Sequence, residues 1–160
     1  MNQIKKIAAI FIASLVTVSS AYCCNDEKES TPKNSVQDTA KAALYFDDEL
    51  NFTINPYGVN DAIKNKKDVV VVDIRSESKY LEGHIPGAIN LPMDKYNGFA
   101  GDEKEYPGLR KDTFNYVYCY ELLCGGGKKA CRKLANLGYP VKLVIGGFKA
   151  WQDSNYPIEK

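Results

Sequence analysis

The sequence predicts a single α/β domain in which helices cover both faces of a central parallel sheet. Two observations lead to this fold class. Short β-rich runs at 69–72, 115–118 and 142–145 alternate with segments of helical spacing. The run at 69–72 consists of four consecutive valines, which is typical of a strand covered on both faces. Strands that alternate with helices favour right-handed crossovers, which place the helices on the two sides of the sheet.

The N-terminal part of the chain is expected to lie outside this domain. Two lysines precede a mostly apolar run at 7–18, and small residues follow up to Ala21. This order is typical of a secretory signal peptide, so we interpret residues 1–21 as a signal that is cleaved after Ala21. The apolar run is too short for a membrane-spanning helix. Residues 22–37 are mostly polar and are predicted to be a flexible tether.

Two adjacent cysteines leave a second N-terminal processing route open. Cys23 and Cys24 follow the apolar run and precede a polar segment, as in a bacterial lipoprotein whose signal ends at residue 22 or 23. Tyr22 and Cys23 are unusual residues directly before a lipidated cysteine. Both routes predict an exported bacterial protein, either periplasmic or anchored to the membrane through a lipid.

The predicted domain covers residues 38–160 and begins with a helix. Residues 38–50 carry apolar side chains at roughly helical spacing, namely Ala40, Ala43, Leu44 and Leu50. After a turn at Asn55, a second helix is predicted over 59–64, with Ala62 and Ile63 facing inward.

The remaining elements follow the valine strand in alternation. Residues 76–82 favour a helical turn, and 88–91 form a short apolar run. Residues 128–137 are amphipathic and end at a glycine, which is a common helix stop. After the strand at 142–145 and a pair of glycines, a last helix is predicted over 148–153.

Composition narrows the classes of function. The 160 residues carry a formal net charge of +1, with 44% hydrophobic and 26% charged residues. We therefore expect no nucleic-acid partner, since that function favours a clustered basic face. The chain has five cysteines and one histidine, and the three later cysteines lack the paired spacing of zinc sites. We expect neither a metal nor another cofactor.

The strongest candidate for a catalytic residue is a cysteine at the end of a strand. Ligands of parallel sheets bind at the carboxyl ends of the strands, where Asp73, Arg75 and Cys119 are predicted to lie. Backbone N–H groups of a glycine-rich loop and the positive end of the next helix favour a thiolate, the nucleophilic form of cysteine. We expect the loop to supply anion-binding groups from Gly125, Gly126, Gly127 and Lys128. A buried, inert Cys119 is the alternative.

The motifs that surround this cysteine resemble a known family. They are Asp73-Ile74-Arg75, Gly83-His84-Ile85-Pro86-Gly87-Ala88-Ile89-Asn90-Leu91-Pro92, Leu137-Gly138-Tyr139, Gly146-Gly147-Phe148, Ala150-Trp151 and Tyr156-Pro157-Ile158. Over about 53–159 the chain is similar to the rhodanese homology domain. The resemblance implies sulfane transfer: Cys119 accepts sulfur from a small donor such as thiosulfate, becomes a persulfide and passes the sulfur to a thiol acceptor. It also implies that His84 belongs to a structural turn. Asp73 and Arg75 are expected to tie the loops together by a carboxylate–guanidinium contact, and Arg75 is also a candidate for substrate binding.

The loop departs from the usual rhodanese pattern. It is about two residues longer than a Cys-x-x-Gly loop and carries a second cysteine, Cys124, as in a rhodanese-like subgroup with two loop cysteines. Glu121 is expected to repel an anionic donor, and Gly125 stands where related phosphatases need arginine.

Two alternatives to a simple sulfurtransferase remain. In an oxidising compartment Cys119 and Cys124 are close enough in sequence for a redox couple in which Cys124 resolves a persulfide. The domain is alternatively a non-catalytic binding module that uses the same fold.

Overall fold

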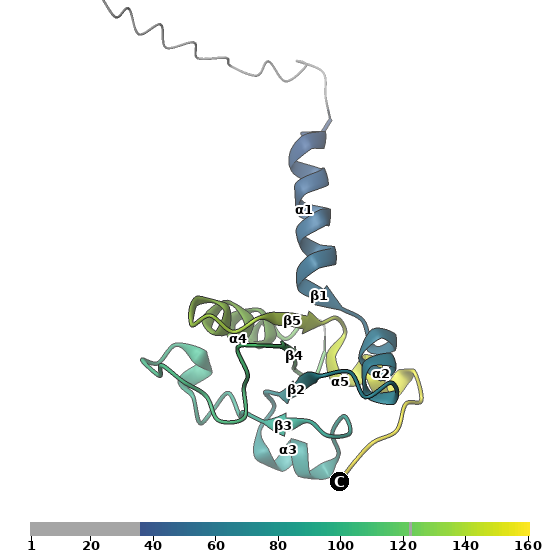
Figure 1. Cartoon of the computed structure of the whole chain (residues 1–160), viewed down its shortest axis with the longest axis vertical. Helices are drawn as coiled ribbons and strands as arrows, with labels where there is room; N and C mark the ends of the chain where they lie inside the picture. The colour runs from purple at the N-terminus through teal and green to yellow at the C-terminus, as the bar shows by residue number, and fades with distance from the viewer. Residues whose placement is uncertain (1–35, 122) are drawn as a thin grey trace, which may run out of the picture. The chain divides into compact units, whose positions relative to one another are not determined.

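The computed structural model describes residues 36–121 and 123–160 (Figure 1). The predicted signal peptide, Cys23, Cys24 and most of the predicted tether lie outside the described residues. Within those described ranges, no helix combines the length and the apolar character needed to cross a membrane.

A five-stranded sheet forms the centre of the domain, and every pairing in it is parallel (Figure 1). The spatial order is β1-β5-β4-β2-β3. The strands are β1 (Thr53–Ile54), β2 (Val69–Asp73), β3 (Ile89–Asn90), β4 (Phe114–Tyr118) and β5 (Val141–Val144). This arrangement confirms the predicted α/β class, while β1 is a strand that the sequence did not predict.

The helices occupy the segments between these strands. They are α1 (Thr39–Phe52), α2 (Pro56–Lys64), α3 (Glu77–Glu82), the 3₁₀ turn η1 (Asn97–Phe99), α4 (Gly125–Asn136) and α5 (Gly147–Asp153). Side-chain caps explain two of the starts. The Asp38 carboxylate accepts a hydrogen bond from the Lys41 N–H at 3.1 Å, and the Asn55 side chain accepts one from the Gly58 N–H at 2.8 Å. Helix α2 begins at Pro56, earlier than predicted, because proline suits the first helical position.

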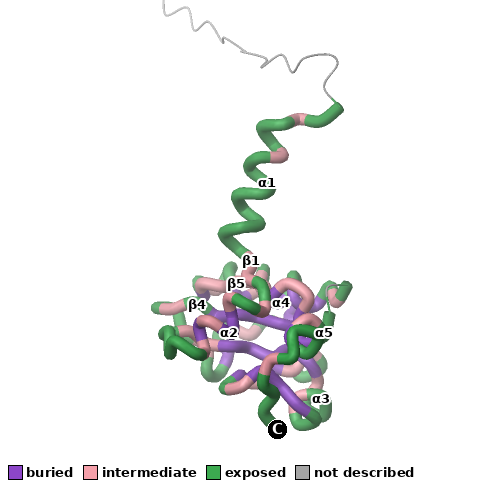
Figure 2. The backbone as a smooth tube through the Cα atoms, turned by 90° about the vertical axis from the view of Figure 1, so that its right-hand side faces the viewer, coloured by how far each residue is buried: buried purple, intermediate pink, exposed green. Residues whose placement is uncertain are grey.

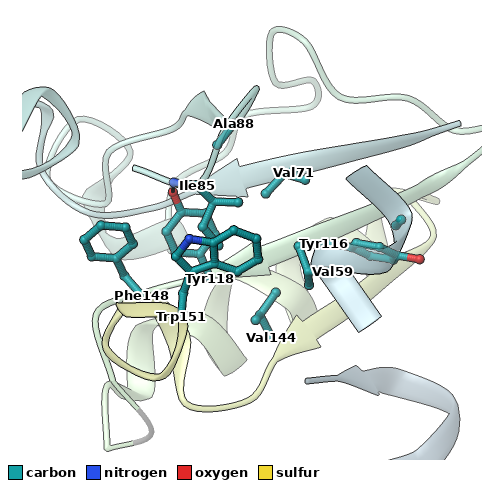
Figure 3. Packing of buried hydrophobic residues seen from close by; sticks show 10 residues of the cluster. Val59, Val71, Ile85, Ala88, Tyr116, Tyr118, Val144, Phe148 and Trp151 are labelled. Carbon is teal, nitrogen blue, oxygen red and sulfur yellow. Dashed lines mark hydrogen bonds between the residues drawn. The ribbon is translucent and has the colours of Figure 1, made fainter. Parts of the chain in front are cut away.

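The sheet separates two hydrophobic clusters, because side chains alternate between its faces. Tyr116 and Tyr118 of β4 belong to the first cluster, with α2 and α5, and Val117 belongs to the second, with α4. Figure 3 shows the first cluster, in which Trp151 and Tyr118 are fully buried. The Trp151 Nε1–H donates to the Pro157 carbonyl at 2.7 Å. Helices therefore cover both faces, as the sequence predicts.

Helix α1 differs from the other long helices because none of its residues is buried (Figure 2). Leu44 is 66% exposed and Leu50 is 75% exposed. The predicted helix is present, but its apolar side chains do not enter either core cluster. Periodicity in a sequence reports where apolar side chains fall around a helix and not whether another element covers them.

Candidate active site

Cys119 lies directly after β4, at the carboxyl edge of the sheet, and is 8% exposed. Its side chain packs in the second cluster, on the face that α4 covers. The Phe148 N–H donates to the Cys119 carbonyl at 2.9 Å, and the Lys149 N–H donates to the Tyr120 carbonyl at 2.7 Å. The first turn of α5 thus holds the backbone at the start of the cysteine loop.

Gly147 makes this close approach of two backbones feasible. Its φ is +58°, a left-handed conformation that favours glycine. A Cβ at this position would lie 2.5 Å from the Cys119 carbonyl oxygen and 2.8 Å from the Tyr120 carbonyl oxygen. A side chain here would therefore displace the loop, so Gly147 belongs to the site although it carries no functional group. The family-like motif pointed to this position, but not to its role against the loop.

Cys119 and Cys124 are joined in a disulfide, with their Cα atoms 6.3 Å apart. Cys124 is the N-cap of α4 and is partly exposed. Its N–H donates to the Glu121 carbonyl at 3.1 Å, and its carbonyl accepts from the Gly127 N–H at 3.3 Å. The structure therefore brings together the two thiols that the sequence singled out, one held by α5 and the other by α4.

The three glycines after Cys124 form the first turn of α4, whereas the sequence predicted a loop there and a helix from residue 128. Gly126 and Gly127 are buried, and a Cβ on Gly127 would lie 2.7 Å from Leu143 Cδ1. Glycine is used here to pack the helix start closely against β5. The positive end of α4 still lies at the cysteine pair, and Lys128 follows in the same turn with an exposed side chain.

The cavity at the two cysteines is very small in this disulfide form. It measures about 20 Å³, and its walls include Cys119, Cys124, Glu121, Gly127 and Lys128. That volume accommodates about one water molecule. An oxyanion such as thiosulfate is larger, so the disulfide form is closed to a donor of that size.

Arg75 takes part in a buried ion pair. Its Nη2 lies 2.5 Å from Asp73 Oδ2 and donates to the Gly83 carbonyl at 2.7 Å, and both side chains are less than a tenth exposed. Burial alone would lower the pKa of Arg75, but the hydrogen bonds and charge of Asp73 outweigh burial and raise it. The guanidinium also lies 3.9 Å from the centre of the Phe148 ring. Arg75 does not line the small cavity at the cysteines.

A larger groove lies beside the loop. It measures about 900 Å³ and is lined by residues from four separate segments, namely Arg75, Lys79, Glu82, Gly83, Tyr120, Phe148, Gln152, Ile158 and Lys160. Tyr120 directly follows Cys119, so the groove borders the cysteine loop. The sequence carries no local signal of this groove, because its walls come from positions far apart in the chain.

His84 and Cys131 make contacts that belong to the fold and not to the cysteine site. The His84 Nδ1 lies 3.0 Å from the Tyr80 carbonyl, its ring stacks on Tyr80, and its backbone pairs with Glu159. Cys131 is a free thiol in α4, and burial raises its pKa to about 12. Neither residue lines the cavity at the cysteine pair.

The chain is similar to a known protein family and to two sulfurtransferases. Residues 57–154 match the family described as "Rhodanese-like domain". The thiosulfate sulfurtransferase GlpE of Coxiella burnetii is 33% identical over 89 residues, which cover 54% of this chain and 75% of that protein. The adenylyltransferase and sulfurtransferase UBA4 of Candida albicans is 30% identical over 105 residues, 64% of this chain, but the match spans only 24% of UBA4.

A solved structure supports the same relationship at the level of the fold. The BH2092 protein of Bacillus halodurans has a TM-score of 0.63 and 29% identity to this chain, and the match covers 76% of this chain and 86% of that protein. The five-stranded parallel sheet is therefore shared with a known structure.

Proposed function

The chain belongs to the rhodanese-like domain family, and from this premise we propose that it is a sulfurtransferase that carries sulfane sulfur as a persulfide on Cys119. One observation carries the proposal: Cys119 is the first residue after β4, at the edge where parallel sheets bind ligands, beside the N-terminus of α4. The similarity to a thiosulfate sulfurtransferase supports the same chemistry.

The proposed transfer begins with the reduced form of the loop. The Cys119 thiolate attacks the outer sulfur of a donor such as thiosulfate, whose S–S bond breaks, and sulfite leaves with the bonding electron pair. The new persulfide then passes its outer sulfur to a thiol acceptor, and Cys119 leaves as a thiolate. The positive end of α4 and the exposed Lys128 favour the thiolate and attract an anionic donor.

We propose further that this chemistry takes place outside the cytoplasm, in the periplasm or at a membrane to which a lipid on Cys23 or Cys24 anchors the protein. The support is the order of lysines, apolar run and small residues before the polar segment. A small sulfur donor and a thiol acceptor are the partners that this proposal requires.

Intact-mass measurement tests the proposed persulfide. The reduced domain is exposed to thiosulfate or to a polysulfide without added thiol, and the Cys124→Ser variant is used to prevent oxidation within the loop. A gain of about 32 Da, one sulfur atom, that dithiothreitol removes is the expected result. The gain should disappear in a Cys119→Ser, Cys124→Ser double variant and persist in a Cys131→Ser, Cys124→Ser control. An adduct that survives without Cys119 would overturn the assignment.

A further inference from the structure

We propose that Cys124 is a resolving thiol that expels sulfide from the persulfide on Cys119, so that the domain reduces sulfane sulfur with electrons from a dithiol. The inference rests on the proposed persulfide and names both its acceptor and its product. The acceptor is a cysteine of the same loop, and the product is hydrosulfide.

The geometry determines which sulfur Cys124 reaches. In the structure the two Sγ atoms are bonded to one another, with a Cα–Cα separation of 6.3 Å. The persulfide consists of the Cys119 Sγ and one further sulfur, and Cys124 therefore has access to the inner atom. Attack on the inner sulfur expels the outer one, whereas attack on the outer sulfur would only move the persulfide to Cys124.

The surroundings of Cys124 suit it to this attack. It is the N-cap of α4, a helix of twelve residues whose N-terminal end stabilises a thiolate at that position. The Phe148 N–H binds the Cys119 carbonyl and ties the start of the loop to α5, and within the loop the Glu121 carbonyl binds the Cys124 N–H. The same backbone contacts that exist in the disulfide thus keep the two sulfurs close together after reduction.

The step balances without an external oxidant. The Cys124 thiolate forms a bond to the Cys119 Sγ, and the bond between that sulfur and the outer sulfur breaks. The outer sulfur leaves with the electron pair as hydrosulfide and is reduced, while the two cysteine sulfurs are oxidised to the disulfide. The persulfide proton, or one from water, stays on the departing sulfur.

A dithiol reductant then completes the cycle. Cys124 is partly exposed, whereas Cys119 is 8% exposed and faces the core. One thiolate of the reductant therefore attacks the Cys124 sulfur and releases the Cys119 thiolate, and the second thiol displaces Cys124. With thiosulfate as donor, the sum is thiosulfate plus dithiol giving sulfite, hydrosulfide, a proton and the oxidised dithiol.

The small size of the cavity supports displacement of the persulfide sulfur by a cysteine of the same loop. With the disulfide formed, the space at the two cysteines is about 20 Å³, too small for a further donor. The domain consequently stops after one donor molecule until a reductant opens the loop. This behaviour separates the proposal from a sulfurtransferase that passes its sulfur directly to an external thiol.

A single-turnover experiment tests the inference. Reduced, desalted protein reacts anaerobically with excess thiosulfate, sulfide is trapped with monobromobimane, and the loop peptides are analysed by mass spectrometry. Wild-type protein should release about one equivalent of sulfide and form the Cys119–Cys124 disulfide. Cys124→Ser and Cys124→Ala should release less than about a tenth as much and retain the persulfide on Cys119. Cys131→Ser, which removes a thiol outside the loop, should behave as wild type.

The outcomes separate this inference from the proposed function. Wild-type protein that keeps its persulfide and releases no sulfide would overturn the resolving role and leave the sulfurtransferase proposal standing. Equal sulfide release from the wild type and both Cys124 variants would also overturn it. A Cys124→Ser variant with native far-UV circular dichroism but no persulfide would overturn the proposed function itself.

Discussion

The Cys119 carbonyl accepts a hydrogen bond from the Phe148 N–H at 2.9 Å, so the last helix of the domain holds the residue that carries the proposed chemistry. The adjoining Gly147 has no side chain that would separate the two segments. The loop is thus positioned by an element almost thirty residues further along the chain, and alterations at the start of α5 should reach the site.

Gly147→Ala should destabilise the domain and slow sulfur uptake. The new methyl group meets two loop carbonyls and stands at a positive φ, which together cost roughly 2–4 kcal/mol of unfolding free energy. Displacement of the loop should reduce the rate of persulfide formation by about tenfold or more. Gly138→Ala is the matched control, because Gly138 also has a positive φ (+83°) but no atom lies within 4 Å of its added Cβ. Urea denaturation and single-turnover mass measurements check both, and equal losses in the two variants would contradict the role of the loop contact.

Arg75→Ala should destabilise the domain by roughly 3–5 kcal/mol, because it leaves the buried Asp73 carboxylate without its partner. Arg110→Ala provides the comparison. Arg110 also binds two carboxylates, those of Asp68 and Asp112, but all three side chains are well exposed. Its removal should cost much less stability than that of Arg75, because exposed ion pairs are screened by water. Chemical denaturation of both variants measures the difference, and a small effect of Arg75→Ala would show that the buried pair contributes little to stability.

Cys131 should resist alkylation in the folded, reduced protein. Burial raises its pKa from an ordinary 9.0 to about 12, so the unreactive thiol form dominates at neutral and mildly alkaline pH. Iodoacetamide at about pH 8 should label Cys124, which is partly exposed at the N-terminus of α4, well before it labels Cys131. Because the folded state holds the Cys131 proton more tightly, stability should fall as pH rises above about 9. Labelling of Cys131 in the folded protein as fast as that of Cys124, read by peptide mapping, would contradict the raised pKa.

Glu121→Gln should accelerate reaction with thiosulfate. The carboxylate is exposed, its residue borders the cavity at the cysteines, and it repels a dianionic donor. Removing one charge at this range should raise the second-order rate constant roughly two- to five-fold at low salt. The gain should shrink at about 0.5 M salt, where charges are screened. Glu77→Gln on α3 removes an exposed charge that does not line this cavity, and an equal acceleration there would point to net charge instead of position.

Expression of the full chain in a bacterium tests the proposed location. We expect a mature protein that begins near residues 22–24 and fractionates outside the cytoplasm. Replacing Cys23 and Cys24 together with serine should abolish partition into the detergent phase if a lipid is attached, without preventing export. A full-length product in the cytoplasmic fraction would rule out the signal peptide.

The fold was largely predictable because local patterns determine it. The four valines at 69–72 and the β-rich run before Cys119 lie in central strands, which need continuous apolar sequence. The start of α4 was misplaced because Gly125, Gly126 and Gly127 favour loops in isolation, whereas they form a helical turn here, in which Gly126 packs closely against Met93 and Gly127 against Leu143 of β5. Tertiary contact overrides local propensity at that point.

The site was predictable in part. Cys119 and Cys124 stand out in the sequence, but spacing alone does not determine whether two sulfurs meet, since that depends on how the loop backbone is held. The groove beside Tyr120 combines Arg75, which follows β2, with residues of α3, α5 and the C-terminal segment. No local pattern reports such a combination.

The sheet ends on both sides in a strand of only two residues, β1 and β3. An outer strand normally presents a row of unpaired backbone groups on which another chain can build, and very short outer strands limit that hazard. Strand addition at these two sides of the sheet should therefore stay limited even when oxidants or reductants rearrange the cysteine loop. Thiol chemistry takes place at the carboxyl ends of the strands. It is thereby kept separate from the β-aggregation that longer outer strands would favour.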